Sequence, residues 1–179
     1  MITKQFSLHP FSSEDSSLNL DIKANLSYNN NQLKIKYSVF GDLEKVAVTP
    51  PSDNPTRQDD LWQTTCFEFF LGIVGSPLYW EFNLSPSGNW NVYSFTGYRE
   101  GMKPETAFEN LLFEFSKQDD RLLLQIQMDT SRLITPSQQL EIAITTVIEE
   151  AENNISYWAL KHSGQQADFH LRDSFIKIA

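Results

Sequence analysis

The chain has 179 residues, and its 14 Lys and Arg against 23 Asp and Glu give a formal net charge of -9. A composition of 40% hydrophobic and 13% aromatic residues suffices for one packed core and excludes intrinsic disorder. The apolar runs fall far short of the roughly 18 residues of a membrane helix, and an acidic chain without a Lys/Arg block is a poor partner for nucleic acid or a membrane surface.

Residues 1–6 contain one lysine and no apolar segment, so the sequence gives no indication of a secretory signal. The single cysteine, Cys66, cannot form a disulfide within the chain, and its apolar surroundings predict a buried, unreactive thiol. We therefore expect a cytoplasmic protein with a single domain spanning residues 1–179.

The first part of the chain alternates hydrophobic and polar residues with a period of two. This alternation runs through residues 18–26 and 33–39, on either side of an Asn-rich turn, and predicts a β-hairpin. Residues 6–8 indicate an earlier strand, and the proline-rich segment 49–60 predicts a long loop. The nearly continuous apolar run 66–71 is typical of a central strand covered on both faces.

A second hairpin is predicted from residues 79–84 and 90–95, joined by the five-residue turn 85–89. If Leu84 pairs with Trp90, alternation divides the hairpin into two faces. One face, expected in the core, carries Trp80, Phe82, Leu84, Trp90 and Val92, and the other carries Tyr79, Glu81, Asn83, Asn91 and Tyr93. The polar face is either a solvated surface or a source of donors and acceptors for sugar hydroxyls.

The rest of the chain continues the β pattern. Residues 97–107 predict a loop, 111–116 and 122–128 a third hairpin, and 140–148, 156–160 and 169–178 further strands. About ten strands with at most short helical turns predict an all-β fold, an antiparallel β-sandwich of jelly-roll type.

The familiar catalytic motifs of hydrolases, phosphate-binding loops and zinc proteins do not occur in the sequence, so we expect no enzyme and no catalytic residue. His162, Asp168 and His170 form the cluster most similar to a metal site. Their spacing matches no standard ligand pattern, so no metal is expected.

Glu68 is unusual because it lies inside the apolar run 66–71, where an unpaired carboxylate is costly. Either an arginine or a tyrosine hydroxyl holds it, or it binds a ligand. Trp80 and Trp90 fit the core, whereas Trp62 and Trp158 are expected to be half exposed. Such indole rings are either ordinary partly buried residues or platforms for sugar rings.

Several segments resemble the bacterial DOMON-like proteins related to family 9 carbohydrate-binding modules. They are CFEFFL (66–71), YWEFNLSPSGNW (79–90), GYREGM (97–102), and YWALKH (157–162) with DFH (168–170). The resemblance covers nearly the whole chain and implies a DOMON-like β-sandwich of about ten strands.

In the sugar-binding relatives, two tryptophans sandwich a terminal sugar, while a glutamate, an arginine and amides bind its hydroxyls. By this resemblance Trp62 and Glu68 match the first tryptophan and the glutamate, and Trp158 is a weaker match to the second tryptophan. The arginine of the next strand is absent, and Arg99 could replace it if its loop folds back. The implied carbohydrate site therefore comprises Trp62, Glu68, Glu81, Asn83, Arg99 and Trp158.

Other members of the superfamily bind haem through a methionine with a histidine or lysine. The chain offers Met102, Met128, His162 and His170, although Met128 alternates with core residues and is better placed in the core. Haem is ranked below sugar for this chain. A third alternative is a protein interaction or assembly module, which includes a homo-oligomer.

Overall fold

The computed structural model describes residues 1–12, 18–135, 137–151 and 153–178. These residues form twelve strands of one antiparallel sheet, in the order β7-β6-β5-β4-β10-β11-β1-β2-β3-β9-β8, with β12 paired to β10. The strands are β1 (Ile2–Pro10), β2 (Leu20–Asn29), β3 (Gln32–Gly41), β4 (Cys66–Ile73), β5 (Tyr79–Leu84), β6 (Trp90–Phe95), β7 (Lys103–Pro104), β8 (Phe113–Lys117), β9 (Leu122–Asp129), β10 (Leu140–Glu149), β11 (Ile155–Ala159) and β12 (Ile176–Lys177). Short 3-10 turns are η1 (Leu43–Lys45), η2 (Leu61–Gln63), η3 (Thr130–Arg132) and η4 (Arg172–Ser174).

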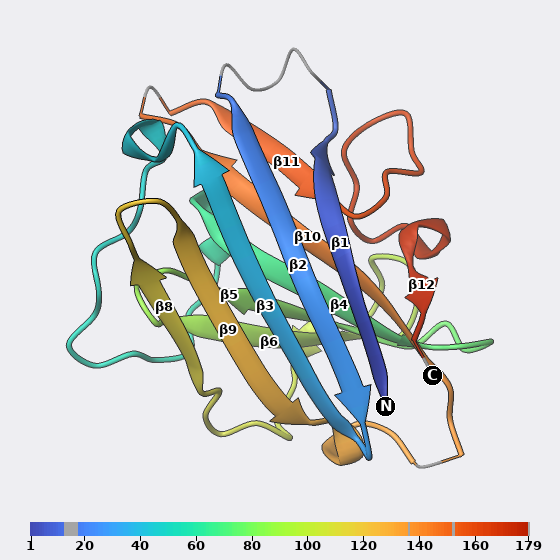
Figure 1. The fold of residues 1–179 in the computed structure, drawn as a ribbon. Coiled ribbons are helices and arrows are strands. Elements are labelled where there is room, and N and C mark those ends of the chain that lie inside the picture. Colours follow the sequence, from blue (N-terminus) through green and yellow to red (C-terminus); the bar gives the residue numbers. More distant parts are fainter. Residues whose placement is uncertain (13–17, 136, 152, 179) are drawn as a thin grey trace.

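The sheet folds back on itself at β1. Most of β1 pairs with β2, whereas only its last two residues, His9 and Pro10, pair with β11. As a result, the first half (β1, β2, β3, β9 and β8) lies across the second half (β11, β10, β4, β5 and β6), as Figure 1 shows. The all-β, antiparallel prediction is confirmed, and the count of twelve among the described residues includes two strands, β7 and β12, of only two residues each.

The main core lies between the two halves of the sheet and receives side chains from both. Ile35 and Val39 of β3 are fully buried there, as are Phe69 of β4 and Phe82 of β5, whose rings stack at 4.3 Å. Burying each such side chain contributes about 1.5–3 kcal/mol. This packing explains why the period-two alternation of the sequence identified the inward faces of the strands.

The second hairpin has the register assumed for its five-residue turn. Leu84 pairs with Trp90, and the inward face of β5 and β6, from Trp80 to Val92, belongs to the main core. Gly88, with φ +91, closes the turn in a left-handed conformation that favours glycine.

The opposite face of β5 and β6 is not a solvated surface, so that interpretation is wrong. Tyr79, Glu81, Asn83, Asn91 and Tyr93 are each at most 5% exposed. Asn91 and Tyr93 hydrogen-bond to Asp59 of the loop before β4, and the ring of Tyr79 packs edge-on against Phe175 near the C-terminus. The predicted strand 169–178 is also wrong, because β12 contains only Ile176–Lys177 and the residues before it cover the second half of the sheet.

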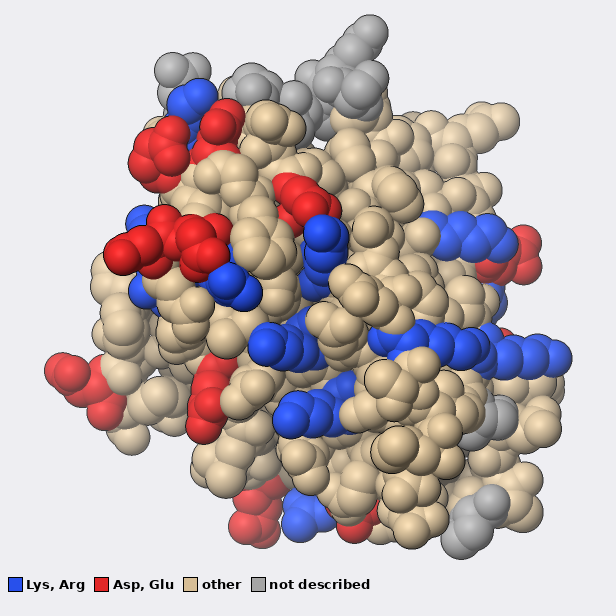
Figure 2. Space-filling model, in the orientation of Figure 1, with Lys and Arg blue, Asp and Glu red and all other residues tan. Residues whose placement is uncertain are grey.

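The outward face of the first half of the sheet is polar and partly basic. Lys23 of β2 and Lys34 and Lys36 of β3 alternate there with buried residues. Figure 2 shows Lys and Arg side chains across the middle of this face and Asp and Glu mostly nearer its edges. The acidic excess of the chain is therefore not spread over this face. No helix among the described residues is long and apolar enough to cross a membrane.

Candidate functional site

A cavity of about 390 Å³ lies on the outward face of β4, β5 and β10. Small-molecule sites usually occupy about 300–1,000 Å³, so its size suits one small ligand. It is lined by Trp62, Glu68, Phe70, Glu81, Phe95, Arg99, Met102, Val147, Tyr157, Ala167, Phe169 and His170.

Four of the six predicted carbohydrate-binding residues line this cavity: Trp62, Glu68, Glu81 and Arg99. Trp62 stands on η2, is half-buried, and meets the ring of Tyr93 edge-on at 6.0 Å. Arg99 reaches the cavity because its loop folds back onto the sheet, where its backbone N–H donates to the hydroxyl of Tyr79 at 3.1 Å.

Asn83 does not line the cavity but supports a residue that does. It is fully buried, and its Nδ2 donates to Oε1 of Glu81 at 3.0 Å. The amide therefore fixes the orientation of the Glu81 carboxyl, and Oδ1 of Asn83 has no hydrogen-bond partner among the described residues.

Trp158 lies in the main core, and the expectation that it is half exposed is wrong. It is only 4% exposed, and its indole N–H donates to the hydroxyl of Ser156 at 2.9 Å. Alternation along β11 turns Trp158 inward and Tyr157 outward, so Tyr157, paired with Val147 of β10, faces the cavity instead.

Glu68 is a buried acid that has no basic partner among the residues that the structure describes. It is 2% exposed, and its Oε1 has no hydrogen-bond partner among the described residues. The hydroxyl of Tyr37 donates to the backbone carbonyl of Glu68 and not to its carboxyl group. Burial, and then repulsion by Glu81, raise the pKa of Glu68 well above its usual value.

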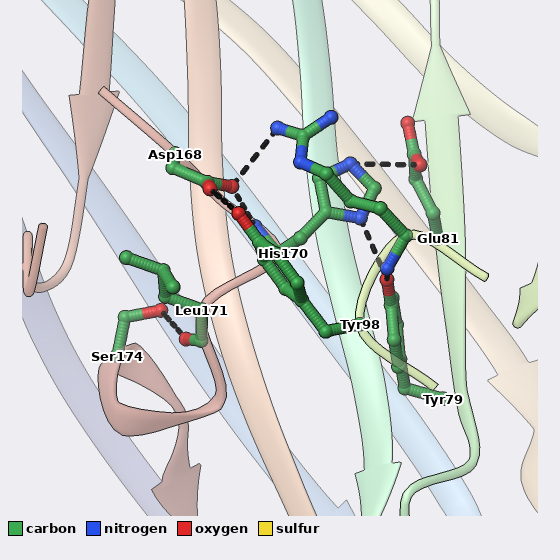
Figure 3. A network of polar contacts seen from close by, with 8 residues as sticks. Tyr79, Glu81, Tyr98, Asp168, His170, Leu171 and Ser174 are labelled. Atoms are coloured by element: carbon green, nitrogen blue, oxygen red, sulfur yellow. Dashed lines mark hydrogen bonds and ion pairs between the residues drawn. The ribbon is translucent and has the colours of Figure 1, made fainter. Parts of the chain in front are cut away.

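A chain of polar contacts links Glu81 to the other side of the cavity (Figure 3). The hydroxyl of Tyr79 accepts from the backbone N–H of Arg99 and shares a hydrogen bond of 2.8 Å with Nδ1 of His170. The other ring nitrogen of His170, Nε2, lies 3.6 Å from Oε2 of Glu81. The network orients both the histidine and the carboxyl group.

Burial shifts the two ends of this network in opposite directions. It raises the pKa of Glu81 to about 7, although Asn83 and Arg99 act against the rise. It lowers the pKa of His170 to about 4, and the Arg99 charge adds to this effect. At neutral pH His170 is therefore uncharged, and Glu81 holds a proton for part of the time.

The edge of the cavity is formed by residues 167–175, which we call the C-terminal cover. Within the cover, Asp168 makes the contacts that hold this edge in place. Asp168 accepts from the hydroxyl of Tyr98, from the Arg99 guanidinium at 2.9 Å and from the His170 backbone at 3.0 Å. Burial alone would raise the pKa of Asp168, but these donors lower it below its ordinary value.

Arg172 fastens the cover to the sheet. Its guanidinium donates to the carboxylate of Glu141 on β10 and to the backbone carbonyls of Ile73, Pro77 and Leu78. The side chain passes so close to β4 that a Cβ on Gly72 would meet it at 2.6 Å. The half-buried Arg172 therefore helps to hold Phe169 and His170 over the cavity.

The candidate metal and haem ligands do not form a site. Among the described residues, no group of three or more His, Cys, Asp or Glu is placed to hold a metal ion. Met128 is 6% exposed in the core, and Nε2 of His162 lies 2.8 Å from the carbonyl of His9. Met102 and His170 both line the cavity, but both ring nitrogens of His170 face protein groups, so these residues do not fit an axial haem pair. Cys66 is buried, as expected.

Comparison with known proteins identifies a solved structure with a similar fold. No family model matches the chain, and no curated protein matches it significantly. The fold is similar to the crystal structure of a protein from Bacteroides uniformis ATCC 8492 that is described as a candidate carbohydrate-binding protein, with a TM-score of 0.73 and 13% identity. The match covers 96% of this chain and 84% of that one. At this identity the similarity shows that the two proteins share an all-β fold.

Proposed function

We propose that the chain is a non-catalytic carbohydrate-binding domain whose cavity holds one sugar ring. The observation that carries the proposal is the convergence of an indole, Trp62, with two buried carboxyl groups, Glu68 and Glu81, on one open cavity. The description of the structural neighbour adds weak support. The finer assignment, a DOMON-like β-sandwich related to family 9 modules, and a cytoplasmic location are part of the same proposal.

The lining matches the two requirements of sugar binding. Sugar rings present C–H faces that pack on aromatic side chains, and Trp62 and Phe169 provide such surfaces. Sugar hydroxyls require donors and acceptors in fixed positions, which Arg99 and the carboxyl groups of Glu68 and Glu81 supply. No specific observation favours an interaction module, which would not need a concave polar cavity.

The proposal is tested by calorimetric titration with a panel of mono- and oligosaccharides. Replacing Trp62 by alanine should weaken the best ligand at least fivefold, because a ring contact contributes about 1 kcal/mol. Trp62→Phe, which keeps an aromatic ring, should lose less affinity than Trp62→Ala. Leu112→Ala, a change at a side chain 78% exposed outside the cavity, is the matched control and should bind like the wild type. The absence of binding across the panel at millimolar sugar would refute the proposal.

A further inference from the structure

The cavity is lined by two buried carboxyl groups but by no buried Lys or Arg among the described residues. Glu68 and Glu81 are 2% and 5% exposed and come from adjacent strands, where Glu68 pairs with Asn83 and Glu81 with Phe70. Arg99 is the one Lys or Arg among the lining residues that the structure describes. Its guanidinium is already paired with Asp168 at 2.9 Å and is 52% exposed at the edge.

Among the residues that the structure describes, no Lys or Arg side chain makes an ion pair with either carboxyl group, and the Arg99 charge acts on Glu81 only from the edge of the cavity. Each ionised group would be costly at this depth unless a proton or an ion from outside compensates it. Oε1 of Glu68 is an atom that lacks such compensation, since it is buried and has no hydrogen-bond partner among the described residues.

The walls of the cavity suit a cation as well. Five aromatic side chains line it, and a ligand ammonium over the face of an aromatic ring is attracted by the ring electrons. They are Trp62, Phe70, Phe95, Tyr157 and Phe169. Two buried acids with an aromatic wall, and no unpaired base among the described lining residues, match a ligand that brings its own positive charge.

We infer that the sugar bound here carries a free ammonium group, as a hexosamine does, and that Glu68 and Glu81 pair with it. This inference rests on the proposed function and narrows its ligand class. A neutral hexose would bring no positive charge to either acid, and an acidic sugar would add a third negative charge.

The titration behaviour of the two carboxyl groups supports this assignment and predicts how ligand affinity changes with pH. Besides each other, the titratable and charged groups that face Glu68 and Glu81 are Tyr37, Cys66, Tyr79, Tyr93, Arg99 and His170. The neighbouring residues of β10, Thr145 and Val147, carry no charge. Because burial raises the pKa of both carboxyl groups, an incoming ammonium group displaces protons. Hexosamine affinity should therefore fall as the pH is lowered through 7, whereas hexose affinity should not.

The test compares matched sugars on the full chain by calorimetry at pH 7. Each of three hexosamines, of gluco, galacto and manno configuration, is measured beside its parent hexose and its N-acetyl derivative. We expect one hexosamine to bind at least tenfold more tightly than both neutral counterparts. Repeating the titration in buffers of different ionisation enthalpy should reveal proton release on binding.

Two variants and one control decide the role of the acids. Glu68→Gln and Glu81→Gln keep the side-chain size and should each reduce the preference for the hexosamine to less than threefold, whereas the exposed Glu114→Gln on β8 should leave it unchanged. Equal affinity for hexosamine and hexose, or an undiminished preference in both variants, would overturn the inference and leave the proposed function standing. Failure of every sugar to bind at millimolar concentration would refute both.

Discussion

Replacing Glu81 by glutamine should stabilise the protein, and the gain should grow with pH. The wild-type carboxyl group is 5% exposed, and burial raises its pKa from 4.5 to about 7. Below pH 4.5 both the folded and the unfolded chain hold the proton, so ionisation of Glu81 has no effect on stability there. As the pH rises further, the unfolded chain releases the proton and the folded chain keeps it, so the free energy of unfolding falls until the pH passes 7.

The size of the effect follows from the pKa. Each pKa unit corresponds to about 1.4 kcal/mol, so the rise to about 7 lowers wild-type stability by about 3 kcal/mol above neutral pH. Glutamine cannot ionise, and its side-chain oxygen can still accept the bond from Asn83. The variant should also ease the repulsion that raises the pKa of Glu68.

The assay is urea unfolding of the wild type and Glu81→Gln at a series of pH values from 4 to 8.5. We expect the difference in unfolding free energy to rise by about 3 kcal/mol across this range in favour of the variant. Taking the difference removes the opposite pH dependence of His170, whose pKa of about 4 destabilises the folded state in acid. For the surface variant Glu114→Gln, the difference in unfolding free energy from the wild type should not change with pH. A difference for Glu81→Gln that does not change with pH would refute the description of Glu81 as a buried acid.

Three further predictions concern the surroundings of the cavity. Arg172→Ala should cost about 2–4 kcal/mol of stability, because it leaves the carboxylate of Glu141 without its partner. Hydrogen exchange at residues 168–170 should also accelerate. Unchanged exchange would contradict the role of Arg172 in holding the cover. Trp158→Phe should lower the thermal midpoint without changing sugar affinity, because Trp158 lies in the main core, and an affinity loss would place it back in the site. Cys66 should react with a thiol reagent only in denaturant, because it is fully buried and burial raises the pKa of its thiol well above the ordinary value. Rapid labelling of the folded protein would contradict this prediction and show that the region around Cys66 opens.

The strands could be predicted from the sequence because each inward face packs against one continuous core. Alternation assigned Trp80 and Val92 to the core and Glu81 to the opposite face, because a side-chain period of two follows from strand geometry alone. In β11 apolar residues stand on both faces, since Ile155 and Tyr157 alternate with Trp158, so alternation alone does not show that Trp158 points inward.

The cover could not be predicted in the same way. Residues 167–175 have no regular period, and they are positioned by long-range contacts such as that of Arg172 with Glu141 on β10 and of His170 with Tyr79 on β5. Contacts between segments more than 30 residues apart leave no local pattern. For this reason the sequence indicated Trp62, Glu68, Glu81 and Arg99, but it did not assign the wall made by Tyr157 and Phe169 to a sugar site.

The four tryptophan indole N–H signals of a ¹⁵N-labelled sample test the central claim most directly. Only Trp62 lines the cavity, whereas Trp80, Trp90 and Trp158 belong to the main core. During titration with the tightest sugar of the panel, the Trp62 signal, assigned by its loss in Trp62→Phe, should shift progressively and saturate, and the Trp158 signal should stay in place. A shift confined to the other three signals, or no shift at all, would contradict the account.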